Sequence, residues 1–335
     1  MKQFEEQLRR EARRLLEEKK IDVLVGYEAG TMPLQSTPCF LTRPEEADRL
    51  IWDATCSTNP ATFVHGILHR HRESQKRRKP QDRTRRVVGV AARGCAARAM
   101  VVHLQENQYT REDVVILGMP CSGVLDLHKV RKELRFQEIM EGSLDGDVVR
   151  VRTKEGGREL ALRECLADSC LSCARNNPAI ADIALGEIEL DVDRGEEFRR
   201  VEEFSALPAG ERWAYLESEM ARCTRCNACR QACPMCYCKD CFAEQTRPQW
   251  FGITDAMPDT IAFHIIRTFH MAGRCVDCGA CTAACPMGID LRTFLKKLEK
   301  DCLEMYDYRS GMDMDKRPPL SDYAANDPQE FITEP

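Results

Sequence analysis

Residues 223–234 read C-T-R-C-N-A-C-R-Q-A-C-P, and residues 275–286 read C-V-D-C-G-A-C-T-A-A-C-P. Both stretches follow the pattern C-x2-C-x2-C-x3-C-P. Three cysteines at this spacing let one backbone loop present three thiolates to three irons of a cubane, while the fourth points away and ligates the other cluster of a pair. The proline after each fourth cysteine suits the first turn of a helix, where its missing N–H is not needed.

The repeated pattern predicts two 4Fe–4S clusters. The expected ligands of cluster one are Cys223, Cys226, Cys229 and Cys285, and those of cluster two are Cys275, Cys278, Cys281 and Cys233. A zinc site or disulfides are the alternative. Zinc takes four ligands per ion and usually uses paired C-x2-C knuckles, so two complete runs closed by proline fit it poorly.

Composition describes a globular protein in a reducing compartment. The chain has 335 residues, enough for about two domains, and its net charge of −5 gives no general attraction to nucleic acid. No apolar run reaches the roughly 18 residues of a membrane span, and the charged N-terminus is not a signal peptide. Without an export signal, nineteen cysteines favour reduced or metal-bound thiols. Because partly exposed clusters are oxygen-sensitive, we expect the cytoplasm of an anaerobe.

The N-terminal part, residues 1–186, is expected to form an α/β domain with a parallel sheet. Residues 2–19 have the periodicity of an amphipathic helix, and turn residues are frequent over 30–44. Apolar strands are predicted over 87–90 and 114–117, and each leads into a turn that opens a helix. This alternation of strand and helix is typical of a parallel sheet.

A third set of cysteines is expected at the mouth of the α/β domain: Cys95, Cys121, Cys170 and Cys173. The first two follow the carboxyl ends of the predicted strands, where open α/β sheets bind ligands. The last two form a C-x2-C knuckle after a predicted hairpin. The set predicts a third 4Fe–4S cluster, and a zinc ion or unligated thiols are the alternatives. Cys165 or Cys56 could replace one member.

The rest of the chain is expected to comprise an acidic linker over 187–212, a mainly α-helical dicluster ferredoxin domain over 213–305 and an extended tail over 306–335. Helical periodicity over 256–271 fills the interval between the two cysteine runs. It places His264 and His270 for packing or for hydrogen bonds to sulfur. The proline-containing tail is expected to lie on a partner subunit or to be mobile.

Three further cysteines follow directly after Pro234, in M-C-Y-C-K-D-C: Cys236, Cys238 and Cys241. Two clusters do not need them. They could ligate another metal centre, together with Cys302, or line a cluster cavity, and the sequence does not separate these possibilities.

Residues 69–86 are strongly basic and nearly free of apolar side chains. A solvated loop is the simplest interpretation. A docking site for an acidic partner or a phosphate-bearing cofactor is the alternative. Nucleic-acid binding is disfavoured because no aromatic residues alternate with the charges.

Two resemblances accompany these motifs. Residues 213–300 resemble the α-helical dicluster ferredoxin domain found in the iron–sulfur subunits of heterodisulfide reductase and of fumarate reductase, with all eight cysteines matched. Residues 20–185 are similar to the beta subunit of deazaflavin-reducing hydrogenases and formate dehydrogenases, through A-R-G-C-A-A-R-A, G-M-P-C-S-G-V-L-D and C-L-S-C. The second resemblance implies a cluster on the third cysteine set. It also implies a flavin in many members, although no G-x-G-x-x-G or other clear flavin motif is present.

The sequence thus predicts an electron-transfer subunit. Its clusters would pass single electrons between redox subunits of a larger complex, such as a flavoprotein, a hydrogenase, a formate dehydrogenase or a heterodisulfide-reductase-like protein. No Ser/His/Asp set or paired carboxylates indicate a catalytic centre. One alternative is a flavin-containing catalytic subunit that oxidises a nicotinamide or deazaflavin carrier. Another is a nucleic-acid enzyme with a structural cluster, which only the basic residues 69–86 support.

Overall fold

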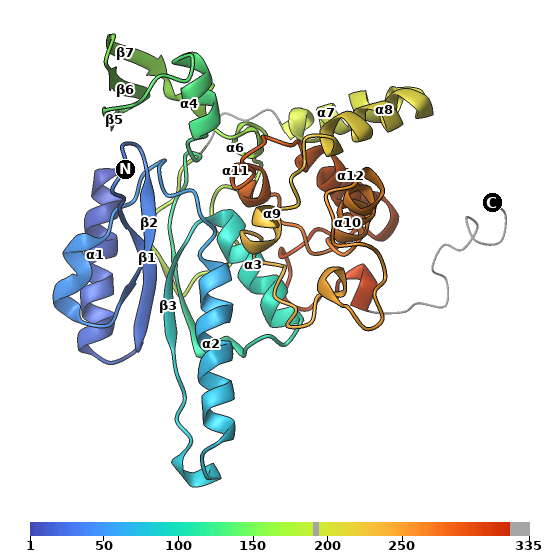
Figure 1. Cartoon of the computed structure of the whole chain (residues 1–335). Helices are drawn as coiled ribbons and strands as arrows, with labels where there is room; N and C mark the ends of the chain where they lie inside the picture. Colours follow the sequence, from blue (N-terminus) through green and yellow to red (C-terminus); the bar gives the residue numbers. More distant parts are fainter. Residues whose placement is uncertain (190–193, 322–335) are drawn as a thin grey trace.

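The computed structural model describes residues 1–189 and 194–321. An α/β half, blue to green in Figure 1, lies beside a helical half, yellow to red. The α/β half is built on a five-stranded sheet in the order β2-β1-β3-β4-β8. The strands are β1 (Val23–Ala29), β2 (Ser36–Leu41), β3 (Val88–Ala92), β4 (Val114–Gly118) and β8 (Ile183–Ala184). β1, β3, β4 and β8 run parallel, β3 and β4 being the strands predicted over 87–90 and 114–117, whereas β2 is antiparallel to β1.

β2 is a strand that the sequence pattern did not indicate. It lies within residues 30–44, where turns were expected, and it contains Pro38 opposite Tyr27. Proline has no backbone N–H to donate to a neighbouring strand. It is tolerated here because β2 forms the edge of the sheet and has only one neighbour. The sheet is therefore mixed at this edge.

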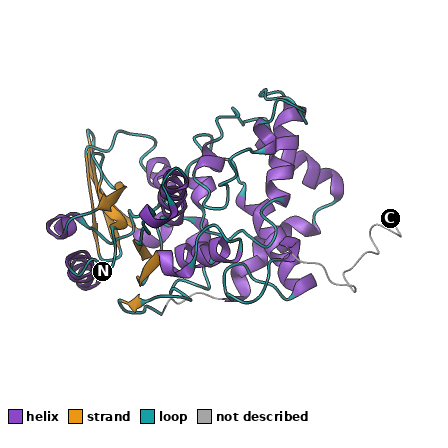
Figure 2. Ribbon diagram, turned by 90° about the horizontal axis from the view of Figure 1, so that it is seen from below, coloured by secondary structure: helices purple, strands orange, loops and turns teal. Residues whose placement is uncertain are grey.

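Helices cover both faces of the sheet, as Figure 2 shows. They are α1 (Lys2–Glu17) on one face, and α2 (Ala61–Lys76) and α3 (Gly94–Gln105) on the other. Side chains of a strand alternate between faces with a period of two. In β1, Leu24 therefore joins the core beneath α1, while Val23 and Val25 join the core beneath α2 and α3.

A smaller antiparallel sheet follows in the chain: β5 (Glu141–Asp145), β6 (Val148–Thr153) and β7 (Gly156–Ala161). The hairpin predicted from the E-G-G turn is confirmed as β6 and β7. The helix expected directly after Cys121 begins later, as α4 (Leu127–Glu133), where the Asp126 carboxylate accepts a hydrogen bond from His128 N at 2.9 Å. This carboxylate is an N-cap and fixes the start of the helix.

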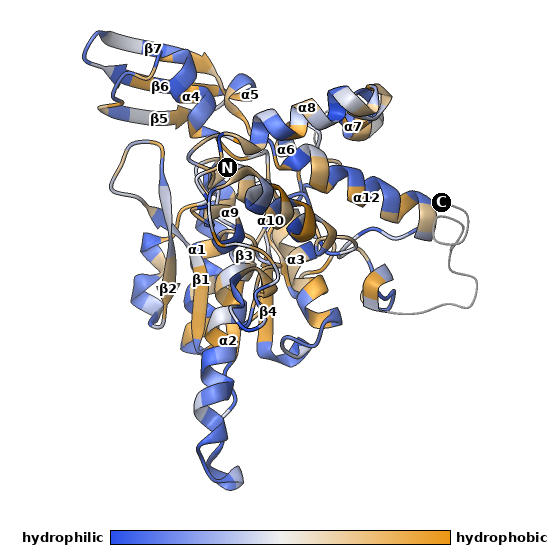
Figure 3. Cartoon of the chain, turned by 45° about the vertical axis from the view of Figure 1, so that its right-hand side comes forward, coloured by the Kyte–Doolittle hydropathy of each residue, from blue (hydrophilic) through white to orange (hydrophobic). Residues whose placement is uncertain are grey.

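The basic residues 69–86 are not a continuous loop. α2 extends to Lys76, and a short 3-10 turn covers Pro80–Asp82. Figure 3 shows the end of α2 reaching beyond the sheet as a hydrophilic arm. The buried residues that anchor this helix, such as Val64 and Leu68, precede the charges, so periodicity within the basic run itself could not reveal it.

Part of the expected linker is helical. α7 (Arg199–Ala206) and the first residues of α8 (Ala209–Met220) fall within 187–212. The Phe204 ring of α7 packs edge-on against Phe294 of α12 (Arg292–Tyr306), with centroids 5.8 Å apart. Residues from 199 onward therefore pack with the helical half, and residues 190–193 lie outside the described residues.

The helical half contains α8, α9 (Ala228–Gln231), α10 (Met257–Phe269), α11 (Ala280–Ala283) and α12. α10 confirms the helix expected between the cysteine runs. The expectation that each proline opens a helix is wrong. α9 and α11 lie inside the runs, and Pro234 and Pro286 follow them in turns. Among the described residues, no helix combines the length and apolar character needed to cross a bilayer.

Residues 307–321 pack on this chain's own α/β half. Arg98 Nε of α3 donates to Ser310 O at 2.9 Å, and Gln105 Nε2 donates to Asp313 O at 2.7 Å. The first part of the expected tail is thus an internal strap over α3. Residues 322–335 lie outside the described residues.

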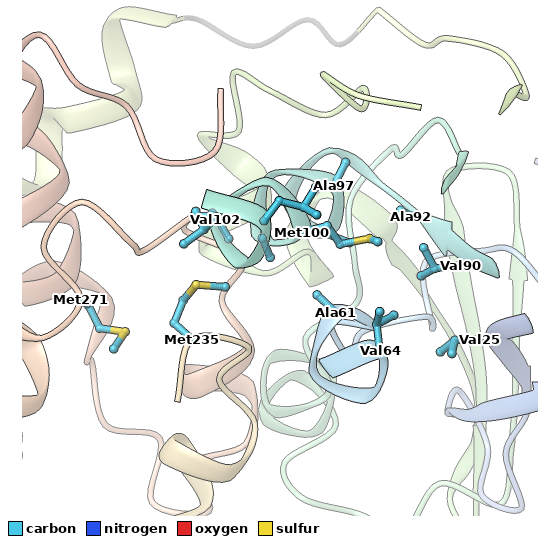
Figure 4. Close-up of a cluster of buried hydrophobic side chains, with 14 of the residues drawn as sticks. Val25, Ala61, Val64, Val90, Ala92, Ala97, Met100, Val102, Met235 and Met271 are labelled. Atoms are coloured by element: carbon cyan, nitrogen blue, oxygen red, sulfur yellow. The ribbon is translucent and has the colours of Figure 1, made fainter. Parts of the chain in front are cut away.

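α3 joins the two halves (Figure 4). Met100 belongs to the core that α3 shares with Val64 and Val90, and the same apolar cluster continues through Met235 and Met271 of the helical half. His103 Nε2 lies 2.7 Å from Pro234 O. The halves are therefore packed around one helix instead of being tethered by a linker.

Candidate iron–sulfur sites

The first cavity is lined by four cysteines that the sequence assigned to cluster one: Cys223, Cys226, Cys229 and Cys285. α10 closes it with Phe263 and His264. His264 Nε2 lies 3.3 Å from Cys223 Sγ, which is the sulfur contact expected for this histidine. Burial lowers the pKa of His264 to about 4, so the ring is neutral, and its tautomer decides whether Nε2 donates to the sulfur or accepts from the thiol.

The second cavity is lined by the other predicted set: Cys233, Cys275, Cys278 and Cys281. Its loop is fixed by Asp277, whose carboxylate accepts from Arg292 Nε at 2.7 Å and pairs with Lys296 Nζ at 3.2 Å. In both cavities the fourth cysteine comes from the opposite run. The structure thus brings together the crossed sets that the spacing predicted.

The two runs have the same backbone shape. Arg225 and Asp277, each two residues after the first cysteine, have φ of 54° and 51°. Asn227 and Gly279, each one residue after the second cysteine, have φ of 58° and 71°. These left-handed residues turn the loop around its cavity and aim N–H groups inward, as Arg225 N does by donating to Cys223 Sγ at 3.4 Å.

The third cavity is lined by Cys95, Cys121, Cys170 and Cys173. The first two follow β3 and β4, at the sheet edge that the sequence indicated. Backbone amides again reach sulfur, since Gly123 N donates to Cys121 Sγ at 3.4 Å and Val124 N donates to Cys170 Sγ at 3.3 Å.

Gly94 allows the chain to close on the third cavity. Its N–H donates to Asn176 O at 3.2 Å, and a Cβ at this position would collide with the carbonyl oxygen of Arg175. Glycine is needed in A-R-G-C because two backbones meet here. The other candidate thiols lie elsewhere: Cys56 is in the core beneath α1, and Cys165 packs with α4 and the small sheet.

The third cavity borders the second, and the second lies close to the first. Cys278 and Asp277 line both the second and the third cavity. The pKa of the Cys278 thiol is raised to about 12, mainly by burial and secondly by Cys95, which shows that this thiol of the third set lies close by. Cys229 of the first cavity and Cys233 and Cys281 of the second all lie near the Arg267 guanidinium. The third, second and first cavities therefore form a series.

The donor chemistry fits 4Fe–4S clusters. Every one of the nineteen cysteines is free of disulfide bonds, and each cavity contains its predicted set of four thiols, the ligand number of a cubane, with Cys278 of the second set also bordering the third cavity. Burial raises the pKa of Cys170 to about 12 and of Cys229 to about 11. These thiols stay protonated until a cation offsets the burial, so cluster binding would release their protons.

The additional cysteines do not form a common cavity. Cys236 lies against Cys233, where a hydrogen bond from the Cys233 thiol lowers the pKa of Cys236. Cys238 is exposed, and Cys241 packs at the edge of the shared core. Within residues 1–189 and 194–321, no group of three or more His, Cys, Asp or Glu side chains is spaced to hold a single metal ion.

Sequence reasoning missed several polar residues around the cavities. Arg267 and Arg98 are buried and Asp277 is half-buried next to the cysteine loops, but charged residues in helices and loops ordinarily indicate solvent exposure. His270 was placed correctly as a packing residue, with its ring 5.0 Å from Phe242.

Comparison with known proteins supports the interpretation of the motifs. Residues 219–289 match the model of the 4Fe–4S dicluster domain. The chain is 22% identical to F420-dependent formate dehydrogenase subunit beta of Methanocaldococcus jannaschii, with 91% of each chain covered. It is 23% identical to F420-dependent formate dehydrogenase 1 subunit beta of Methanococcus maripaludis, covering 91% of this chain and 90% of the relative.

Among solved structures, a chain of the F420-reducing [NiFe] hydrogenase complex from Methanosarcina barkeri aligns with a TM-score of 0.33 and 17% identity. The alignment covers 49% of this chain and 58% of that one. A similarity this low adds nothing to the fold assignment.

Proposed function

We propose that this chain is an iron–sulfur subunit that relays single electrons between redox partners of a multi-subunit oxidoreductase. Three neighbouring cavities, which contain the three predicted sets of four cysteines, carry the proposal. A structural role would need one cluster, whereas a series of neighbouring sites suits transfer from one to the next. The match to the 4Fe–4S dicluster domain over residues 219–289 supports the two C-terminal sites.

The chain's own residues bind and insulate the clusters. Cys223, Cys226, Cys229 and Cys285 would hold cluster one; Cys275, Cys278, Cys281 and Cys233 cluster two; and Cys95, Cys121, Cys170 and Cys173 a third. When bound, each cluster supplies reversible one-electron chemistry. Amide N–H groups donate to ligand sulfurs, His264 Nε2 contacts Cys223 Sγ, and the core around α3 packs against cysteines of the second and third sites.

The relay runs through the α/β half to the first cavity. Cys226 is exposed, which supports docking of a redox partner at the first site. The relatives, beta subunits of formate dehydrogenases, support a partner that handles formate, dihydrogen or hydride. The free cysteines support a reducing compartment, the cytoplasm.

The test is the iron, acid-labile sulfide, zinc and flavin content of the anaerobically purified chain, beside two variants. We expect about twelve irons per chain, four for each cluster. C121S, which removes a ligand of the third site, should retain about eight irons. C165S, which alters a buried cysteine outside the cavities, should retain all of them.

Other outcomes separate the alternatives. About eight irons with zinc in the native chain would make the third site structural, and unchanged iron in C121S would remove Cys121 from its ligands. A stoichiometric flavin would favour a catalytic subunit that oxidises a nicotinamide or deazaflavin carrier.

A further inference from the structure

Arg267 is a buried cation between the first two cavities. It projects from α10 and is 5% exposed. One guanidinium nitrogen donates to Cys229 O at 3.1 Å, while the Nε atom has no hydrogen-bond partner. A buried donor without a partner is costly, so its presence indicates a group that completes the site.

The surroundings of Arg267 contain thiols in place of carboxylates. Burial lowers the pKa of the guanidinium, but Cys233, Cys281, Cys229 and Cys236 raise it more, and the net pKa lies above its usual value. Among the ion pairs of the described residues, none joins Arg267 to a carboxylate. Nearby cations differ: Arg292 pairs with Asp277 at 2.7 Å, and Lys296 pairs with Glu299 at 2.7 Å.

A buried charge is tolerated only when it is compensated. At Arg267 the available compensation is negative charge on cysteine sulfur, from both cavities at once. A cluster held by four thiolates is net negative and gains one more negative charge when it is reduced. The guanidinium keeps its proton in both states, so it can stabilise the electron without any proton transfer.

We propose that Arg267 is a shared counter-charge that raises the reduction potentials of clusters one and two together. Because the guanidinium lies near thiols of both cavities, it shifts both potentials in the same direction. In each step one electron leaves one cluster and enters the other, and no bond forms or breaks. This inference rests on the proposed cluster relay.

The experiment is a reductive titration of anaerobic protein followed by electron paramagnetic resonance. R267Q should load its clusters, and both C-terminal midpoints should move to lower potential. We expect at least a tenfold change in each one-electron equilibrium constant, about 59 mV per tenfold. R267K, which keeps the charge, should stay closer to the native values. If R267Q loses iron, R267M replaces it, because an apolar side chain of similar length fills the same space.

K297Q is the matched control, since it removes one positive charge from a partly exposed lysine of α12 that pairs with Asp301. Its midpoints should equal those of the native chain. Fully loaded R267Q with native midpoints, or a shift in one cluster only, overturns the inference. Native protein with fewer than about eight irons contradicts instead the proposed function.

Discussion

Asp277 shows how one charged residue fixes a cysteine loop. It lies between Cys275 and Cys278 and accepts hydrogen bonds from two nitrogens of Arg292, at 2.7 and 2.8 Å. Burial opposes its ionisation, but Arg292 and Lys296 reverse that effect and hold its pKa below the usual value. The ionised carboxylate therefore anchors the loop of the second cavity to α12.

D277N should destabilise the protein by about 3–5 kcal/mol, because it leaves the largely buried Arg292 guanidinium without its carboxylate partner. The measurement is denaturant unfolding under anaerobic conditions. D301N, which breaks the more exposed pair with Lys297, should cost no more than about 1 kcal/mol. Equal losses in the two variants would show that the Asp277 network is not a structural anchor.

At the scale of elements, α3 combines two tasks. Its first turn carries Cys95, and its last turn holds His103 between the halves, with Nε2 toward Pro234 O and Nδ1 3.3 Å from Tyr109 OH. Burial lowers the pKa of His103 to about 3. The neutral ring donates from Nε2 to the carbonyl oxygen of Pro234, the residue that follows the predicted cluster ligand Cys233.

This burial makes stability depend on pH. Because the folded pKa of His103 lies below the unfolded value of about 6.5, its contribution is present above pH 6.5 and is lost as the pH falls. Between pH 7 and pH 5 the native chain should lose about 2 kcal/mol of unfolding free energy through this residue.

The H103Q side-chain amide can still donate to Pro234 O but does not titrate. The unfolding free energy of H103Q should therefore fall by about 2 kcal/mol less than that of the native chain between pH 7 and pH 5. The measurement is unfolding free energy at several pH values for both proteins. Parallel profiles would exclude His103 as the source. The comparison with the variant removes the acid sensitivity that any cluster adds to both.

At the scale of the whole molecule, the two halves share one core. Val90 and Met100 of the α/β half belong to the same buried cluster as Phe263 and Met271 of the helical half. Arg98 adds buried hydrogen bonds to Ser310 O and Val276 O, at 2.9 and 3.2 Å. Separation of the halves would expose apolar surface and leave these groups unpaired.

A fragment that contains only residues 1–189 should therefore fail to unfold cooperatively and should bind a hydrophobic dye. Co-expression with residues 194–335 should restore a cooperative transition and the iron content. Calorimetry measures the cooperativity of unfolding, and dye fluorescence measures the exposed apolar surface. Both are applied to the fragment, to the two co-expressed fragments and to the intact chain. A fragment that unfolds cooperatively on its own would show that the α/β half is an independent domain.

The sequence alone predicted the ligand sets, because the spacing of cluster ligands is a local pattern. The two C-x2-C-x2-C-x3-C-P runs imply crossed fourth ligands, and the structure brings those thiols together. Cys95 and Cys121 could also be grouped, since they follow adjacent parallel strands. Tertiary structure alone decided what surrounds the thiols. The edge position of β2, the packing of α7, the strap over α3 and the burial of Arg267 depend on contacts between residues far apart in sequence, and no local periodicity records those contacts.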